Sequence, residues 1–258
     1  MWRILIDSIY LTILYPITLI ICIFIGYKIS KKMYINKNRS WKASGIETSV
    51  ISIFALLLSF TFLSSYNSMK SRIELMHETS DASANQRRTS LLSSDSLKLD
   101  TREYLIDYLD ILHNFRSYYL QSEEKLKTEI EKVNKVYLAQ LVAISRSGAA
   151  GKKEVENLMP YFNHLNANFY HIINSYDERT PHIIILLLLV SSWLIGILVG
   201  FMNAFHERRH FLVPFIFVVL VSGSIQCIRD LDNPYEGIIQ PNFNDFANQR
   251  EALIQHIR

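Results

Sequence analysis

Two histidines and a glutamate within residues 206–210 are the residues whose types and spacing most directly suggest chemistry. The segment is His-Glu-Arg-Arg-His, which fits the H-E-x-x-H pattern of zinc metalloproteases. On a continuous helix, both histidines of such a pattern face one side and bind zinc, with a third ligand and an open position for water. Whether this chain can use the pattern depends on the elements that would position it.

Long segments that are almost free of charge lie on both sides of this motif. Each approaches or exceeds the roughly 20 residues that a helix needs to cross about 30 Å of hydrocarbon. We therefore predict an integral membrane protein with four transmembrane helices. The first segment lacks an A-x-A cleavage site and is followed by a basic run, so we interpret it as a retained anchor rather than a signal peptide. The four segments are 9–27, 48–65, 182–205 and 211–228.

This arrangement places residues 206–210 in the short turn between the third and fourth membrane helices. Pro214 would fix the first turn of the fourth helix, which leaves little room for both histidines on one helix. Asp230 and Asp232 would lie roughly 27 Å away at 1.5 Å per residue, and Glu47 is the one acid expected on the same side. We interpret the motif as a polar membrane boundary, and we expect no enzyme activity, metal or cofactor.

The basic residues favour one orientation in the membrane. The loop at 28–47 carries six lysines and arginines against one acid, and the turn at 206–210 carries two arginines. By the positive-inside rule both short loops lie in the cytoplasm, so the two termini and segment 66–181 would lie outside. The formal net charge is only +3, and no basic-aromatic patch suggests nucleic-acid binding. We expect a multi-pass protein of a bacterial inner membrane.

Segment 66–181 has the periodicity of amphipathic helices. We expect the second membrane helix to continue past Tyr66, and Asp100 with Glu103 to start a new helix as a capping box. A break is expected at 148–151. Apolar residues recur at three- and four-residue steps, which predicts an antiparallel bundle outside the membrane. These stripes are Leu105, Leu109 and Leu112; Leu126, Ile130, Val133, Tyr137 and Leu141; and Leu158, Phe162, Leu165, Phe169, Ile172 and Tyr176.

The predicted fold class is all-α, with a long extramembrane helical bundle between the second and third of four transmembrane helices. We expect residues 1–65 to form the first pair of transmembrane helices, joined by the basic loop 28–47. Residues 66–181 would form the bundle, and residues 182–228 would form the second pair of transmembrane helices. Residues 229–258 form a turn and a short amphipathic helix. The apolar residues of that helix are Phe246, Leu253, Ile254 and Ile257.

Two short motifs carry a family resemblance. The first is "SIFALLLSFTF" together with the glycine before it and the polar helix after it. The residues that fit the family pattern are Gly45, Ala55 to Leu58, Phe60, Phe62, Arg72 and Glu78. The second is "LDNPYEG", with Asp232, Pro234 and Gly237 in place. Together they resemble the bestrophin-like bacterial membrane family, which is distantly related to bestrophin anion channels. The resemblance extends over nearly the whole chain.

The resemblance implies a homo-oligomer, and a pentamer if the assembly is that of bestrophins. It also implies a central pore for an inorganic anion such as chloride. The second membrane helix would line this pore, and Ser52, Leu56 and Phe60 would match its constriction. Ser52 stands where a bulky apolar residue is expected. The chain also lacks the acidic run of the bestrophin calcium clasp, so no calcium site is implied.

Two alternatives remain open at this point. Bestrophin termini are cytoplasmic, whereas the loop charges place these termini outside. The same amphipathic stripes also suit a non-conducting membrane sensor or scaffold, whose helical bundle binds a signal or partner.

Overall fold

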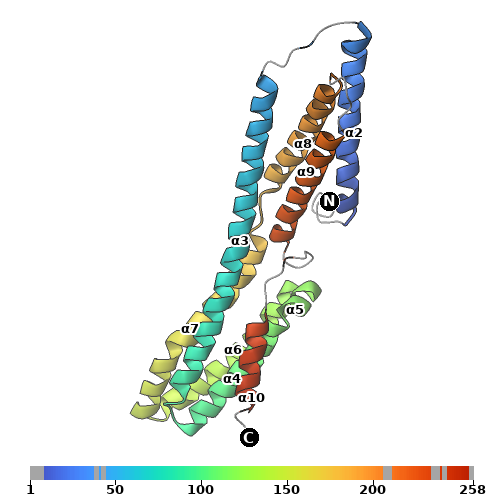
Figure 1. Ribbon diagram of the computed structural model, residues 1–258. Helices are drawn as coiled ribbons and strands as arrows, with labels where there is room; N and C mark the ends of the chain where they lie inside the picture. The colour runs from blue at the N-terminus through green and yellow to red at the C-terminus, as the bar shows by residue number, and fades with distance from the viewer. Residues whose placement is uncertain are drawn as a thin grey trace. The chain divides into compact units, whose positions relative to one another are not determined.

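The computed structural model describes residues 9–37, 41, 45–205, 211–233, 239 and 243–255. Regular structure in these ranges is helical, without strands. The chain divides into two compact units, one of Met1–Met69 with Arg179–Ile239 and one of Lys70–Glu178 with Gln240–Arg258 (Figure 1). Helix α3 (Ile46–Ser90) contributes its first half to the first unit and its second half to the other. The predicted all-α class is confirmed.

The first unit holds the transmembrane helices. Four of the described helices are long and apolar enough to cross a membrane, and they match the four predicted segments, with α8 ending two residues before the predicted end and α9 beginning one residue after the predicted start. They are α2 (Ile9–Met33), the apolar part of α3, α8 (His182–Asn203) and α9 (Leu212–Asp232). As predicted, α3 continues past Tyr66 without interruption, because polar helix-forming residues follow its apolar half.

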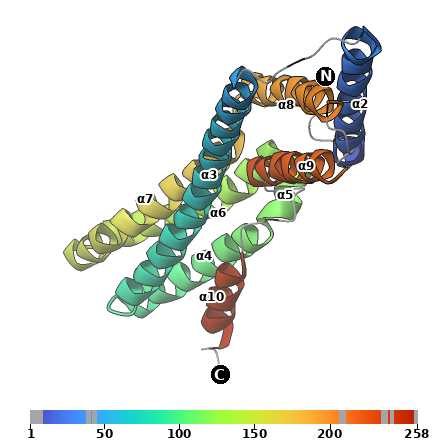
Figure 2. The same ribbon diagram turned by 45° about the horizontal axis from the view of Figure 1, so that its top comes forward.

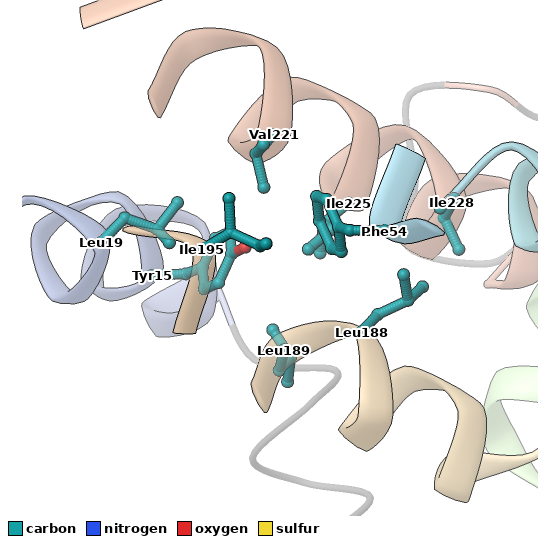
Figure 3. Close-up of a cluster of buried hydrophobic side chains, with 9 residues drawn as sticks. All are labelled: Tyr15, Leu19, Phe54, Leu188, Leu189, Ile195, Val221, Ile225 and Ile228. Atoms are coloured by element: carbon teal, nitrogen blue, oxygen red, sulfur yellow. The ribbon is translucent and has the colours of Figure 1, made fainter. Parts of the chain in front are cut away.

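One apolar cluster joins these four helices. In Figure 3, Val221 and Ile225 of α9 point toward α8, where Leu188 lies, and Phe54 of α3 lies beside Ile225. The side chains in this cluster are at most 6% exposed. Phe54 is the member that α3 contributes, so this helix joins the cluster through one face. The members are Tyr15, Leu19, Phe54, Leu188, Leu189, Ile195, Val221, Ile225 and Ile228.

Helices α2 and α8 approach each other most closely, and glycines permit this approach. A Cβ on Gly200 would lie 1.9 Å from the carbonyl oxygen of Ile23, and a Cβ on Gly26 would lie 1.9 Å from that of Ile197. Gly196 and Gly200 form a G-x-x-x-G pair on α8, the spacing that lets helix backbones pack closely in lipid. Two side-chain bonds add to this contact. Tyr15 donates to Ser192 Oγ (2.8 Å), and Trp193 donates to Thr18 Oγ1 (3.0 Å).

The second unit is a helical bundle. It contains the second half of α3 with α4 (Asp95–His113), α5 (Phe115–Gln121), α6 (Glu123–Arg146), α7 (Ala149–Asp177) and α10 (Asn244–Gln255). Helix α6 packs on α4 and on α7, and α10 packs on α4 (Figure 2). Ser94 before α4 donates to Glu154 near the start of α7 (2.8 Å), so these helix starts share one end of the bundle.

The predicted stripes of this bundle are buried. Every member is in the core except Val133, which is partly buried. The large rings Tyr104, Tyr137 and Phe162 pack together, with Tyr104 stacked on Tyr137 at 4.2 Å between centroids. The periodicity of the sequence therefore identified the core of the bundle.

Two predicted boundaries in the bundle are wrong. Helix α4 begins at Asp95 after Ser94, not at Asp100, because Asp95 already supplies the acidic residue of a first turn. Asp100 lies inside the helix, where it accepts a hydrogen bond from Gln140 (3.2 Å). The predicted break at 148–151 is also shorter than expected. Ser147 and Gly148 make the turn, where Gly148 has a φ of +150° that glycine tolerates best, and α7 begins at Ala149.

The predicted C-terminal amphipathic helix is α10, with Phe246 and Leu253 buried. Ile254 is more exposed, and Ile257 lies outside the described residues. Arg102 of α4 donates to the Leu253 carbonyl from Nε (2.9 Å) and Nη2 (2.6 Å). A guanidinium at this position satisfies carbonyls that a helix leaves free at its C-terminus, so it fixes the end of α10.

Candidate functional site

Helix α3 has one face that packs within its own unit. Phe54, Thr61 and Ser65 are at most 6% exposed and follow one another at helical spacing. The Thr61 hydroxyl donates to the Leu57 carbonyl of its own helix (2.9 Å), so it is satisfied locally. Through this face α3 contacts the buried cluster and Thr180 of its own unit.

The three predicted constriction residues lie together on another face of α3. Ser52, Leu56 and Phe60 are all exposed, with 56% of Leu56 and 62% of Phe60 accessible. The Ser52 hydroxyl donates to the Thr48 carbonyl (2.9 Å), and Ser59 likewise donates to the Ala55 carbonyl (2.8 Å). The face therefore presents apolar side chains and hydroxyls that already have partners. Copies of such a face around an axis would form apolar rings.

The exposed face of α3 changes character beyond its apolar half. Leu63, Asn67, Lys70 and Glu74 continue it at three- and four-residue steps, and all four are exposed. Lys70 and Glu74 form an ion pair at 3.4 Å. A single continuous helix thus joins an apolar exposed face to a charged one.

Asp232 of the predicted family motif ends α9 in a buried polar chain. Thr180, just before α8, donates to Asp232 Oδ1 (3.0 Å). Because a hydroxyl has one proton, Ser65 of α3 is then the donor to Thr180 Oγ1 (3.1 Å). All three side chains are buried. The chain links the end of α9, the start of α8 and the packed face of α3, so it holds α3 in place.

We expect Thr180→Val to lower the free energy of unfolding by about 1–3 kcal/mol, because it leaves buried polar groups of Ser65 and Asp232 without a partner. Thr180→Ser is the control, since it keeps the hydroxyl and loses one methyl group. Thermal unfolding of both purified variants in the same detergent measures the difference. Equal stability of the two variants would show that the polar chain does not determine the position of α3.

The remaining predicted positions lie outside the described residues. These are Pro234 and Gly237 of the turn and His206 to His210 of the H-E-x-x-H segment. Within the described ranges, no group of three or more His, Cys, Asp or Glu side chains is placed to hold a metal ion.

The sequence analysis missed two features that position the candidate site. Thr180 gave no signal, because a single threonine before a proline is common in any loop. The G-x-x-x-G pair at Gly196 and Gly200 was a visible signal, since small residues four apart favour close helix packing in membranes. Both features become meaningful only when the neighbouring helix is known.

The fold and these contacts define a class: a membrane protein with four transmembrane helices and an extramembrane helical bundle. The Bestrophin-like domain family matches residues 42–240, which is most of the chain. The chain belongs to the Bestrophin-like family. The predicted resemblance is therefore confirmed. A search of curated protein sequences found no match.

Solved structures share this fold over nearly the full length. Crystal structures of a bacterial bestrophin homologue from Klebsiella pneumoniae superpose with a TM-score of 0.71 at 14% identity, covering 96% of this chain and 97% of the homologue. A variant of that homologue gives 0.72 at 14% identity, covering 95% and 99%. Another variant gives 0.73 at 14% identity, covering 95% and 98%.

Proposed function

We propose that this protein is an oligomeric channel that passes small inorganic anions such as chloride passively, with α3 lining the pore. The observation that carries the proposal is the exposed face of α3. Leu56 and Phe60 extend away from the packed core of their own unit, on the face next to the hydroxyls of Ser52 and Ser59. Membership in the Bestrophin-like family favours a central pore over a lipid-facing position for this face.

The proposed constriction works through its apolar side chains. Symmetric copies of Leu56 and Phe60 form stacked rings, and a narrow apolar ring loses its water and closes the path. The positive edges of the Phe60 rings can stabilise an anion that passes. We propose a pentamer, as in bestrophins, with the basic loop 28–47 toward the cytoplasm, as the positive-inside rule favours.

The charged part of the exposed α3 face affects whether anions or cations are attracted to the proposed pore. Lys70 attracts anions, whereas Glu74, Glu78 and Asp81 follow on exposed positions of α3 and attract cations. Because the carboxylates are more numerous, this charged part of α3 does not by itself favour anions, and the proposal assigns the preference for anions to the constriction at Phe60.

We expect the purified full chain in liposomes to conduct without an energy source. The measurement is the reversal potential under a potassium chloride gradient, which has opposite signs for chloride and potassium. A chloride potential supports the full proposal, while a potassium potential overturns anion selectivity. No conduction from folded oligomers would contradict a channel and favour the sensor or scaffold.

A further inference from the structure

An apolar groove lies on the transmembrane unit where the second half of α2 meets the end of α8 and the start of α9. Ile20, Phe24 and Tyr27 of α2 form one wall, Asn203 closes the end of α8, and Phe215 stands on α9. The groove has a volume of about 810 Å³, within the usual range of ligand sites of roughly 300–1,000 Å³. Its walls are almost wholly apolar, and its polar members, Tyr27 and Asn203, lie toward the helix ends.

Aromatic side chains mark the membrane boundary at this end of the unit. Trp41 stacks on Phe205 at 5.0 Å between centroids, and Tyr34 meets Phe201 edge to face at 5.6 Å. Tryptophan and tyrosine gather at the level of the lipid headgroups. The groove therefore extends from headgroup depth into the hydrocarbon.

Lysines stand at the mouth of the groove. Ile20, Phe24, Tyr27 and Lys31 follow one another at four- and three-residue steps, so Lys31 continues the groove-lining face of α2 by one turn. Lys28 extends its Nζ over the Phe24 ring, 4.7 Å from the centroid. Both lysines are exposed, and the structure gives neither one a carboxylate partner among the described residues.

We propose that this groove binds one anionic phospholipid, with an acyl chain between α2 and α9 and the phosphate between Lys28 and Lys31. The apolar walls match a hydrocarbon chain, and basic pockets between membrane helices bind anionic headgroups. A second copy of the chain is the competing occupant. The lysines decide against it, because a protein partner would have to bury their two unpaired charges. The site involves no residue of the proposed pore.

The experiment counts lipids bound to the purified full-length protein by native mass spectrometry. The probes are phosphatidylglycerol and phosphatidylcholine with identical acyl chains, so that they differ only in headgroup charge. We expect the wild type to prefer phosphatidylglycerol, and Lys28→Gln with Lys31→Gln to lose roughly fivefold of that preference for each lysine. Lys32→Gln is the control, because Lys32 lies about 100° around the helix from Lys31 and about 40° past Lys28, on the side away from the groove-lining face of α2.

A second variant tests the groove itself. Ile20→Trp fills it from an exposed position and is expected to lower the binding of both lipids without changing the oligomer. If Lys32→Gln reduced the preference as much as the double variant, the proposed headgroup site would be wrong. Dissociation of the oligomer by Ile20→Trp, with lipid binding unchanged, would instead show that a second copy covers the groove.

Discussion

Replacing Gly200 by leucine is expected to prevent α2 and α8 from packing and so to disrupt the transmembrane unit. The first atom of any side chain at this position would lie 1.9 Å from the Ile23 carbonyl oxygen, which is backbone and cannot rotate away. Overpacking typically costs about 1–3 kcal/mol when side chains can adjust. Here the helices themselves must separate, so we expect a loss at or above the upper end of that range.

The measurement is the yield of monodisperse protein and its thermal midpoint in detergent. Gly223→Leu is the matched control, because a Cβ on Gly223 of α9 meets no atom within 4 Å. The control is expected to purify like the wild type, whereas Gly200→Leu aggregates or unfolds at a lower temperature. Equal behaviour of the two variants would show that the close approach of α2 and α8 does not stabilise the unit.

Much of this fold follows from patterns that need no knowledge of the partner helix. The apolar segments predict membrane helices because each is long enough, as a helix, to cross the hydrocarbon core of a bilayer. The stripe from Leu158 to Tyr176 predicts a buried face because its spacing places all members on one side of α7. Local chemistry also explains why the predicted start at Asp100 is wrong. Asp95, five residues earlier, can also supply the acidic residue of a first helical turn. The sequence alone does not decide which of the two aspartates begins the helix.

The candidate site required the structure for a different reason. Whether a residue of α3 faces its own unit or the outside depends on which helices surround it, and the periodicity of an uncharged segment does not encode that. Phe54 and Phe60 are the same residue type six positions apart, yet one is 6% exposed and the other 62%. The family resemblance suggested Phe60, and the structure shows that its side chain is exposed on its own unit.

Phe60→Ala is expected to change conduction by the largest amount among single substitutions on α3. Removing the ring from an exposed position widens an apolar constriction and lets it hold water, so anion flux rises severalfold. Because Phe60 makes no contribution to the buried cluster of its own unit, folding and oligomer size should be preserved. Chloride flux from liposomes that contain equal amounts of wild type and variant measures the effect.

The sharpest control for that measurement is Phe62→Ala on the same helix. Phe62 is also exposed, at 40%, and lies at nearly the same depth as Phe60, but the two residues point about 200° apart around the α3 axis. A pore along the Ser52, Leu56 and Phe60 face predicts that only the Phe60 variant alters flux. If both variants raised flux equally, the change would reflect a looser helix, and if only Phe62→Ala did so, the pore would lie on the opposite face.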